Sequence, residues 1–266
     1  MDGAERAMSG STFQTIRYEV AGGIGRVTLN RPDRLNGMTN QMVRETHDAL
    51  VEAAADASIR VLVLTGEGKA FCPGADLKHF TAGESDERLE ARHFQVATLF
   101  HEISAVTVAA VNGACAGAGF GWAMACDLRV AAASAKFNTA FLDVAVAGDM
   151  GVPWTLTRLI GSARARELFF LPGKFDAERA RELGLLAAVF PDDSFREEAE
   201  AVVQRLAAAS PTALTTLKTN FLAAERMTLR DYVDFEAERH LRVSASADTA
   251  EAFRAFMEKR PPRFGG

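Results

Sequence analysis

Two segments rich in small residues carry the clearest chemical signal in this chain. The first is Ala70 to Lys78 (AFCPGADLK), and the second is Asn112 to Asp127 (NGACAGAGFGWAMACD). Each follows an apolar run typical of a buried strand and opens into a predicted helix. Small residues let backbone N–H groups approach a ligand, and the first turn of a helix has N–H donors without intrahelical acceptors. Two such turns together could stabilise a developing oxyanion.

Each segment also has a purely structural interpretation. Taken alone, either one fits equally well an ordinary strand-to-helix turn, in which glycine only permits close packing. The presence of both segments in one chain favours the oxyanion interpretation.

Asp149 is the candidate for proton transfer. It stands in the stretch Gly148-Asp149-Met150-Gly151, among apolar residues. Burial disfavours the charged form of a carboxyl and raises its pKa, which suits a base that removes a proton from carbon. The alternative is structural, because Asp is a favoured N-cap and Pro153 suits the first turn of a helix that begins near Gly151. Both interpretations remain open, and Asp143 is a second candidate acid that more simply faces solvent or a subunit contact.

Strands and helices alternate in the part of the chain that carries these segments. Uninterrupted apolar runs such as Val61-Leu62-Val63-Leu64 indicate strands buried on both faces, as in a parallel sheet covered by helices. The predicted strands are 16–20, 26–30, 61–65, 106–111 and 128–132, and the predicted helices are 40–55, a stretch ending at 104, and 117–126. This alternation predicts an α/β fold.

The last third of the chain is predicted to be helical. Apart from one strand at 186–190, the pattern predicts helices over 163–171, 177–183, 195–208, 211–224, 229–245 and 249–259. We therefore divide the chain into a core of residues 13–205 and a C-terminal helical region of residues 206–266, preceded by a frayed polar tail. The apolar faces of the helical region either cap its own core or pack on neighbouring subunits.

The composition is that of a globular protein without unusual partners. The chain has 266 residues, of which 48% are hydrophobic, and its formal net charge of −5 leaves no global basic field for nucleic acid. The three cysteines and five histidines are scattered without metal-ligand spacing, so no metal site is expected. No apolar run reaches the length of a signal peptide or a membrane span, and we expect a cytoplasmic protein.

The two small-residue segments closely resemble the signature of the crotonase (enoyl-CoA hydratase/isomerase) superfamily. The resemblance also takes in Leu29-Asn30-Arg31-Pro32, Leu156 to Gly161 and Phe256 to Arg260, and extends from about Tyr18 to Phe264. It implies a crotonase-like α/β fold, a spiral of strand-strand-helix turns with a C-terminal helical trimerisation region. It further implies a homotrimer or dimer of trimers and an acyl-CoA thioester as substrate, with no separate cofactor.

By this resemblance, the catalytic groups are two backbone donors and one acid. The N–H groups of Ala75 and Ala118 would hold the thioester oxygen, and such donors are worth about 3 to 4 kcal/mol each. The family usually has glycine at the position of Ala118, and alanine still donates its N–H when its φ is negative. Asp149 matches an acid that double-bond-shifting members use to move a proton. The two glutamates of family hydratases match Gly121 and Phe141, which exchange no proton.

The resemblance also implies a substrate-binding set. Lys78 matches a position that contacts CoA phosphates, and Arg34 lies in a loop that borders the adenine, although either could be an ordinary surface cation. Lys259 resembles a lysine that relatives offer to CoA, and Phe256 would line the acyl channel. The complete predicted set is Arg34, Gly74, Ala75, Asp76, Leu77, Lys78, Gly117, Phe141, Phe256 and Lys259.

A site with one acid favours an isomerase that moves a double bond in an acyl-CoA. Hydration of a double bond requires one group to activate water and another to protonate carbon, whereas one acid suffices to move the bond. The alternatives are a hydratase with an atypical site, an enzyme whose Asp149 attacks an aryl-CoA as a nucleophile, and a non-catalytic acyl-CoA binder. The acyl chain length is not determined by the sequence.

Overall fold

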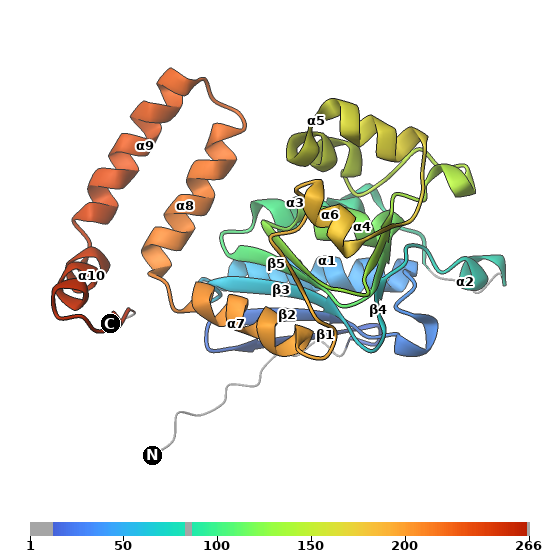
Figure 1. Cartoon of the computed structure of the whole chain (residues 1–266), viewed down its shortest axis with the longest axis horizontal. Coiled ribbons are helices and arrows are strands. Elements are labelled where there is room, and N and C mark those ends of the chain that lie inside the picture. Colours follow the sequence, from blue (N-terminus) through green and yellow to red (C-terminus); the bar gives the residue numbers. More distant parts are fainter. Residues whose placement is uncertain (1–12, 83–86, 265–266) are drawn as a thin grey trace, which may run out of the picture.

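The computed structural model describes residues 13–82 and 87–264, and its core is a spiral of strand-strand-helix turns (Figure 1). The predicted polar tail lies outside these residues. A six-stranded sheet has the order β1-β2-β3-β5-β7-β10. Its first pair is antiparallel and the others are parallel. The strands are β1 Ile16–Ala21, β2 Ile24–Leu29, β3 Val61–Gly66, β5 Val106–Val111, β7 Leu128–Ala132 and β10 Ala188–Phe190.

A second sheet of very short strands was not predicted. Its order is β4-β6-β8-β9, and its strands are β4 Ala70–Cys72, β6 Ala114–Ala116, β8 Lys136–Asn138 and β9 Phe175–Asp176. The first three of these each follow a long strand of the six-stranded sheet after a tight connection. At Gly113 an added Cβ would lie 2.2 Å from the backbone oxygen of Lys69, so glycine permits this close approach.

Both faces of the six-stranded sheet are buried, as the apolar runs predicted. Leu62 and Leu64 of β3 belong to the larger hydrophobic cluster, and Val61 and Val63 belong to the cluster on the opposite face. Burial of each such side chain contributes about 1.5 to 3 kcal/mol. The larger cluster includes residues of α1 Asn40–Ala55, α3 Val96–Glu102 and α4 Gly117–Ala125, and the smaller one includes residues of α7 Phe195–Ala207.

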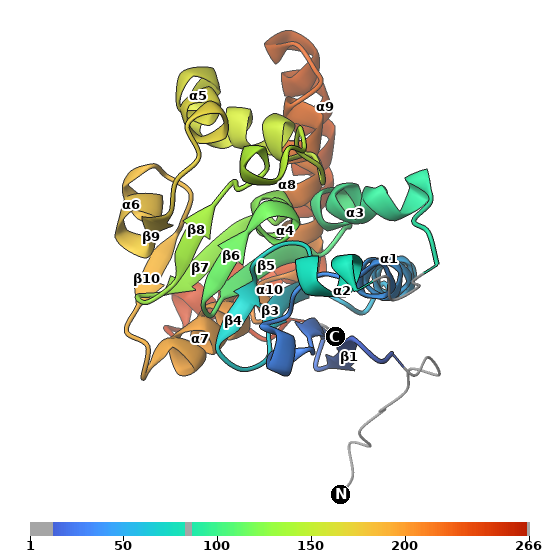
Figure 2. The same cartoon turned by 90° about the vertical axis from the view of Figure 1, so that its right-hand side faces the viewer.

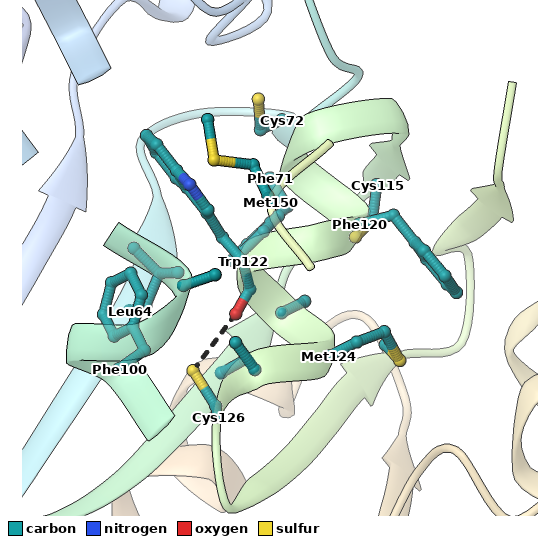
Figure 3. Packing of buried hydrophobic residues seen from close by; sticks show 14 of the residues in the cluster. Leu64, Phe71, Cys72, Phe100, Cys115, Phe120, Trp122, Met124, Cys126 and Met150 are labelled. Carbon is teal, nitrogen blue, oxygen red and sulfur yellow. Dashed lines mark hydrogen bonds between the residues drawn. The ribbon is translucent and has the colours of Figure 1, made fainter. Parts of the chain in front are cut away.

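Helix α4 is buried along its whole length and forms the centre of the larger cluster. Figure 3 shows Phe120, Trp122 and Met124 on this helix, with Phe71, Cys72 and Met150 gathered around it. All sides of the helix therefore face the protein interior. Only its N-terminal end can face a ligand.

The remaining core helices include one long kinked helix, α5 Val152–Phe170. It is interrupted at Gly161, whose φ of 78° and ψ of 157° are non-helical. The piece before the kink begins next to Gly151, where the sequence predicted a helix start, and the piece after it corresponds to the helix predicted over 163–171. The short elements are η1 Pro32–Arg34, α2 Leu77–Thr81, η2 Ala91–Gln95 and η3 Leu142–Val144, and the longer ones are α5 Val152–Phe170 and α6 Ala177–Glu182.

The C-terminal helices extend away from the core (Figures 1 and 2). They are α8 Pro211–Ala224, α9 Leu229–Ser244 and α10 Ala247–Met257. The buried Lys218 of α8 ties them to the core through an ion pair of 2.5 Å between its Nζ and Asp127 Oδ2. Large apolar side chains on these helices remain exposed, among them Leu217, Phe221, Leu229, Leu241, Phe253 and Phe256. No helix in the described ranges is long and apolar enough to cross a membrane.

Candidate active site

The two small-residue turns meet at the start of α2 and α4, as the sequence predicted. Gly74 has a φ of 98° and Gly117 a φ of 52°, which are left-handed conformations that glycine adopts freely. A Cβ on Gly117 would lie 3.5 Å from the Cα of Gly74, so the two backbones are in contact. Ala75 and Ala118, which follow these glycines, are therefore brought to one place.

The N–H groups of Ala75 and Ala118 are available to a ligand. Met38 and Ala75 form a parallel bridge, but its hydrogen bonds involve the neighbours of Ala75. The Met38 N–H donates to the Gly74 oxygen at 2.8 Å, and the Asp76 N–H donates to the Met38 oxygen at 2.9 Å. No acceptor for the Ala75 N–H occurs within residues 13–82 and 87–264. Ala118 lies in the first turn of α4, so its N–H has no intrahelical acceptor. It is absent from the residues with positive φ, so alanine is tolerated at this position.

Asp76 holds the first turn in place and does not titrate in the neutral range. Its carboxylate accepts from the His79 N–H at 3.1 Å and forms an ion pair with the Arg31 guanidinium at 2.9 Å. Burial by itself raises the pKa of Asp76, but the hydrogen bond from His79 and the charge of Arg31 outweigh it and hold the pKa below its ordinary value. Asp76 therefore positions the segment as a permanent carboxylate and N-cap of α2.

Asp149 is half-buried in the turn before α5, and it does not cap that helix. The N-cap is Gly151, at a φ of 68°, and it has no side-chain capping bond. The Oδ1 atom of Asp149 is buried and has no hydrogen-bond partner among the described residues. The capping interpretation of Asp149 is therefore wrong. Burial raises the pKa of this carboxyl to about 6, so it can exchange a proton near neutral pH.

The two positions that match the hydratase glutamates are closely packed. A Cβ on Gly121 would lie 2.7 Å from Val152 Cγ2 and 2.8 Å from Met150 Cβ. Phe141 is buried and stacks on Phe169 of α5, with ring centroids 5.8 Å apart and planes inclined by 3°. Neither position holds a titrating group, and a glutamate at either one would have to displace packed atoms.

The predicted phosphate-binding cations lie on two neighbouring loops. Arg34 ends η1 and Lys78 lies in α2, and the bridge between Met38 and Ala75 joins these loops. Both side chains belong to exposed residues, and neither forms an ion pair within the part of the chain that the structure describes. Their contact with the phosphates of CoA stays a prediction.

Phe256 and Lys259 are not brought to this site within one chain. Figure 1 shows α10 and α2 at opposite ends of the molecule, and the Phe256 side chain is 82% exposed. Their roles toward CoA stay predictions that require a second copy of the chain.

The sequence did not reveal the stacking of Phe169 on Phe141 or the contact between Met150 and Gly121. Phe169 lies near the end of α5, whereas Phe141 lies before that helix begins, and no local pattern links the two rings. Met150 carried one available signal, since it lies in the turn-rich stretch Gly148-Asp149-Met150-Gly151, where a non-glycine residue can adopt a positive φ.

Comparisons with known proteins support the fold and the family resemblance. A family model described as enoyl-CoA hydratase/isomerase matches residues 19–266. A Rhodobacter capsulatus protein named "Probable enoyl-CoA hydratase" is 36% identical over 96% of this chain and 99% of its own length. The 1,2-epoxyphenylacetyl-CoA isomerase of Escherichia coli K12 is 34% identical, with the same two coverages. The crystal structure of an enoyl-CoA hydratase subunit from Geobacillus kaustophilus superposes with a TM-score of 0.85 at 35% identity, over 96% of this chain and 100% of that one.

Proposed function

The chain belongs to the enoyl-CoA hydratase/isomerase family, in the crotonase superfamily, and from this premise we propose that it moves a carbon–carbon double bond in an acyl-CoA. The observation that supports an isomerase is the number of titrating groups. Asp149 has a buried oxygen without a hydrogen-bond partner in the described residues, whereas the positions that the resemblance matches to the hydratase glutamates hold Gly121 and Phe141. Addition of water needs two proton-transfer groups, and the shift of a double bond needs one.

The proposed reaction uses the two backbone donors and the one carboxylate. The thioester oxygen accepts hydrogen bonds from the N–H groups of Ala75 and Ala118. The Asp149 carboxylate removes a proton from the α-carbon of a 3-enoyl-CoA, and the C–H electron pair moves into a dienolate whose negative charge rests on the thioester oxygen. Asp149 then returns the proton to the γ-carbon on the same face, which yields the conjugated 2-enoyl-CoA with no net gain or loss of atoms.

The raised pKa of Asp149 supports this role. A general base works best when its pKa lies near the operating pH, because it is then largely ionised and still basic enough to accept a proton from carbon. Burial raises the pKa of Asp149 to about 6, which meets both conditions at neutral pH. A fully solvated aspartate, with a pKa of about 3.9, would be a weaker base.

The CoA part of the substrate is assigned to cations on two copies of the chain. Arg34 and Lys78 would meet its phosphates from the loops beside the oxyanion turns. Phe256 of α10 and Lys259, which lies just after that helix, would come from a neighbouring copy in a trimer or a dimer of trimers. The exposed apolar faces of α9 and α10 support such packing, as does an apolar cavity of about 450 Å³ between α5 and α8, lined in part by Leu159, Leu217 and Phe221.

The test is the conversion of 3-enoyl-CoA to 2-enoyl-CoA, followed by the absorbance of the conjugated thioester. Asp149→Asn keeps the shape of the side chain and removes its basicity, so we expect kcat to fall about a thousandfold. The matched control is Asp143→Asn in the same loop, because Asp143 is exposed and should leave kcat unchanged.

Three outcomes would contradict the proposal. One is rapid hydration of 2-enoyl-CoA that survives Asp149→Asn, which would indicate a hydratase. Another is a covalent adduct on Asp149 detected by mass spectrometry with an aryl-CoA, which would indicate a nucleophile. The third is tight binding of acyl-CoA without turnover of 2-enoyl, 3-enoyl or dienoyl substrates, which would indicate a binding protein.

A further inference from the structure

We propose that Met150 is a positioning residue for Asp149, and that its buried side chain, seated against Gly121 of α4, fixes the turn that presents the carboxyl. The catalytic consequence rests on the proposed function. The geometric consequence, which is that the inner oxygen of the carboxyl is held away from solvent, does not depend on that function.

Met150 is buried in a strained conformation. Its φ of 46° lies in the left-handed region, where the Cβ of a non-glycine residue crowds the following carbonyl oxygen. Such strain persists only where the surroundings over-determine the conformation, and it concentrates at functional sites. The side chain of Met150 is 4% exposed and belongs to the hydrophobic cluster of Phe71 and Trp122, where Figure 3 shows it beside α4. Packing of this side chain is the interaction that opposes the backbone strain.

Gly121 provides the place where Met150 packs. An added Cβ on Gly121 would come within 2.8 Å of Met150 Cβ and 2.7 Å of Val152 Cγ2. Carbon atoms do not approach so closely, so any side chain at this position would push the turn away from α4. The resemblance places a glutamate of family hydratases at position 121. The absence of a side chain there therefore permits the Asp149 turn to pack against α4.

The turn must orient Asp149, because no hydrogen bond does so at its inner oxygen. Asp149 Oδ1 is buried without a partner in the described residues. The backbone around it is bonded instead, since the Val152 N–H donates to the Asp149 oxygen at 3.1 Å and the Thr155 N–H donates to the Gly151 oxygen at 3.0 Å. The direction of the carboxyl thus follows from the backbone of residues 149–152, which Met150 and Val152 fix against α4.

Desolvation is the cause of the raised pKa of Asp149, and no charged neighbour contributes to it. Among the described residues, the Cys72 thiol is a titratable group that interacts with Asp149, and burial raises the pKa of that thiol to about 12, so it stays neutral. A movement of the turn toward solvent would therefore lower the pKa of Asp149, and the pKa reports its position directly.

The experiment combines four variants with two measurements. Met150→Gly relieves the left-handed strain and removes the packed side chain, Met150→Leu keeps a side chain of similar volume, and Gly121→Ala adds the displacing methyl. The control is Ala145→Gly, which relieves strain at a φ of 57° in the same loop where the residue is exposed. The pKa of Asp149 is measured by carbon-13 NMR of labelled aspartate carboxyls, assigned with Asp149→Asn, and kcat and KM are measured with 3-enoyl-CoA.

We expect Met150→Gly and Gly121→Ala to lower the pKa of Asp149 from about 6 toward the solvated value of about 3.9. We also expect them to lower kcat at least tenfold, with KM changed less than threefold. Met150→Leu should keep kcat within threefold, and the pKa of Asp149 within half a pH unit, of the parent values. Ala145→Gly should change neither quantity. If Met150→Gly does not fold, Gly121→Ala tests the same displacement.

The proposal is overturned if the folded variants titrate at Asp149 as the parent does, with the same kcat and only a lower Tm. Met150 would then be an ordinary core residue. A lower pKa in the variants together with a parent protein that turns over no 3-enoyl-CoA would support the positioning of Asp149 and contradict the isomerase function.

Discussion

The oxyanion turns and the Asp149 turn deliver chemistry in opposite ways. In the oxyanion turns, residues 72–76 and 116–119, two backbones touch, and the donors are N–H groups that every residue except proline provides. In the Asp149 turn, residues 148–152, one side chain would carry the proposed proton transfer, its inner oxygen has no partner in the described residues, and the backbone at Met150 is strained.

This difference teaches where each part is vulnerable. Backbone donors are expected to tolerate a change of side chain, but they do not tolerate an added atom where two backbones meet. A side-chain base depends on its chemical identity and on its desolvation, and both can be lost without loss of the fold. The following predictions separate the two kinds of sensitivity.

After the loss of the Asp149 carboxylate, the next largest effect is expected at the contact between the oxyanion turns. Gly119→Ala would place a Cβ 2.4 Å from the Cys72 backbone oxygen, so α4 and β4 would have to separate and the donors would move apart. Loss of one oxyanion donor costs about a hundred- to a thousandfold in kcat, and we expect at least a hundredfold here. Gly173→Ala is the matched control, because its added Cβ meets nothing within 4 Å. Full activity of Gly119→Ala would show that this contact does not position the donors.

The pH dependence of the reaction should report Asp149. Because the base must be ionised and burial raises its pKa to about 6, kcat/KM should level off above that pH. Below it, kcat/KM should fall about tenfold per pH unit, since kcat/KM follows the protonation of the free enzyme. Measurement from pH 5 to pH 8 tests this slope. A flat profile in that range would contradict a desolvated aspartate as the base.

Removal of the charge at Asp149 should stabilise the fold at alkaline pH. The folded pKa of about 6 lies above the unfolded value, so the stability is greatest below the unfolded pKa and is lost as the pH rises through the folded pKa. The full shift corresponds to about 3 kcal/mol, which we discount to about 1 to 2 kcal/mol because the residue is only half-buried. Asp149→Asn should therefore raise the free energy of unfolding by that amount at pH 8 and by little at pH 4, as measured in urea. Equal effects at both pH values would indicate a cause other than ionisation.

The smallest catalytic effect is expected from a change of side chain at a backbone donor. Ala118→Gly keeps the N–H and restores the residue that the family usually has, so kcat should change less than about twofold. Its cost should be conformational, about 0.5 to 1 kcal/mol of stability, because glycine is unfavourable in a helix. A large loss of kcat without a loss of stability would mean that the methyl group of Ala118 itself shapes the site.

The long elements could be predicted because each carries its signal locally. The helix predicted over 40–55 has the observed bounds, since its apolar face recurs at helical spacing and Thr39 caps it by accepting from the Met42 N–H. The strands at 106–111 and 128–132 also agree, because each is a nearly continuous apolar run. The second sheet was missed, because strands of two or three residues are too short to show a period of two.

The sequence by itself determined which groups exist: two glycine-rich turns that can present N–H donors, one acid at position 149, and no titrating side chain at Gly121 or Phe141. Only the tertiary structure decided how they act. It showed that Asp149 does not cap α5, that Gly121 faces Met150, that Phe141 stacks on Phe169, and that α10 lies far from α2 in the same chain. The reason is physical: residue types and local periodicity are written along the chain, whereas desolvation, contact and strain arise between segments that are distant in sequence and meet only in the fold.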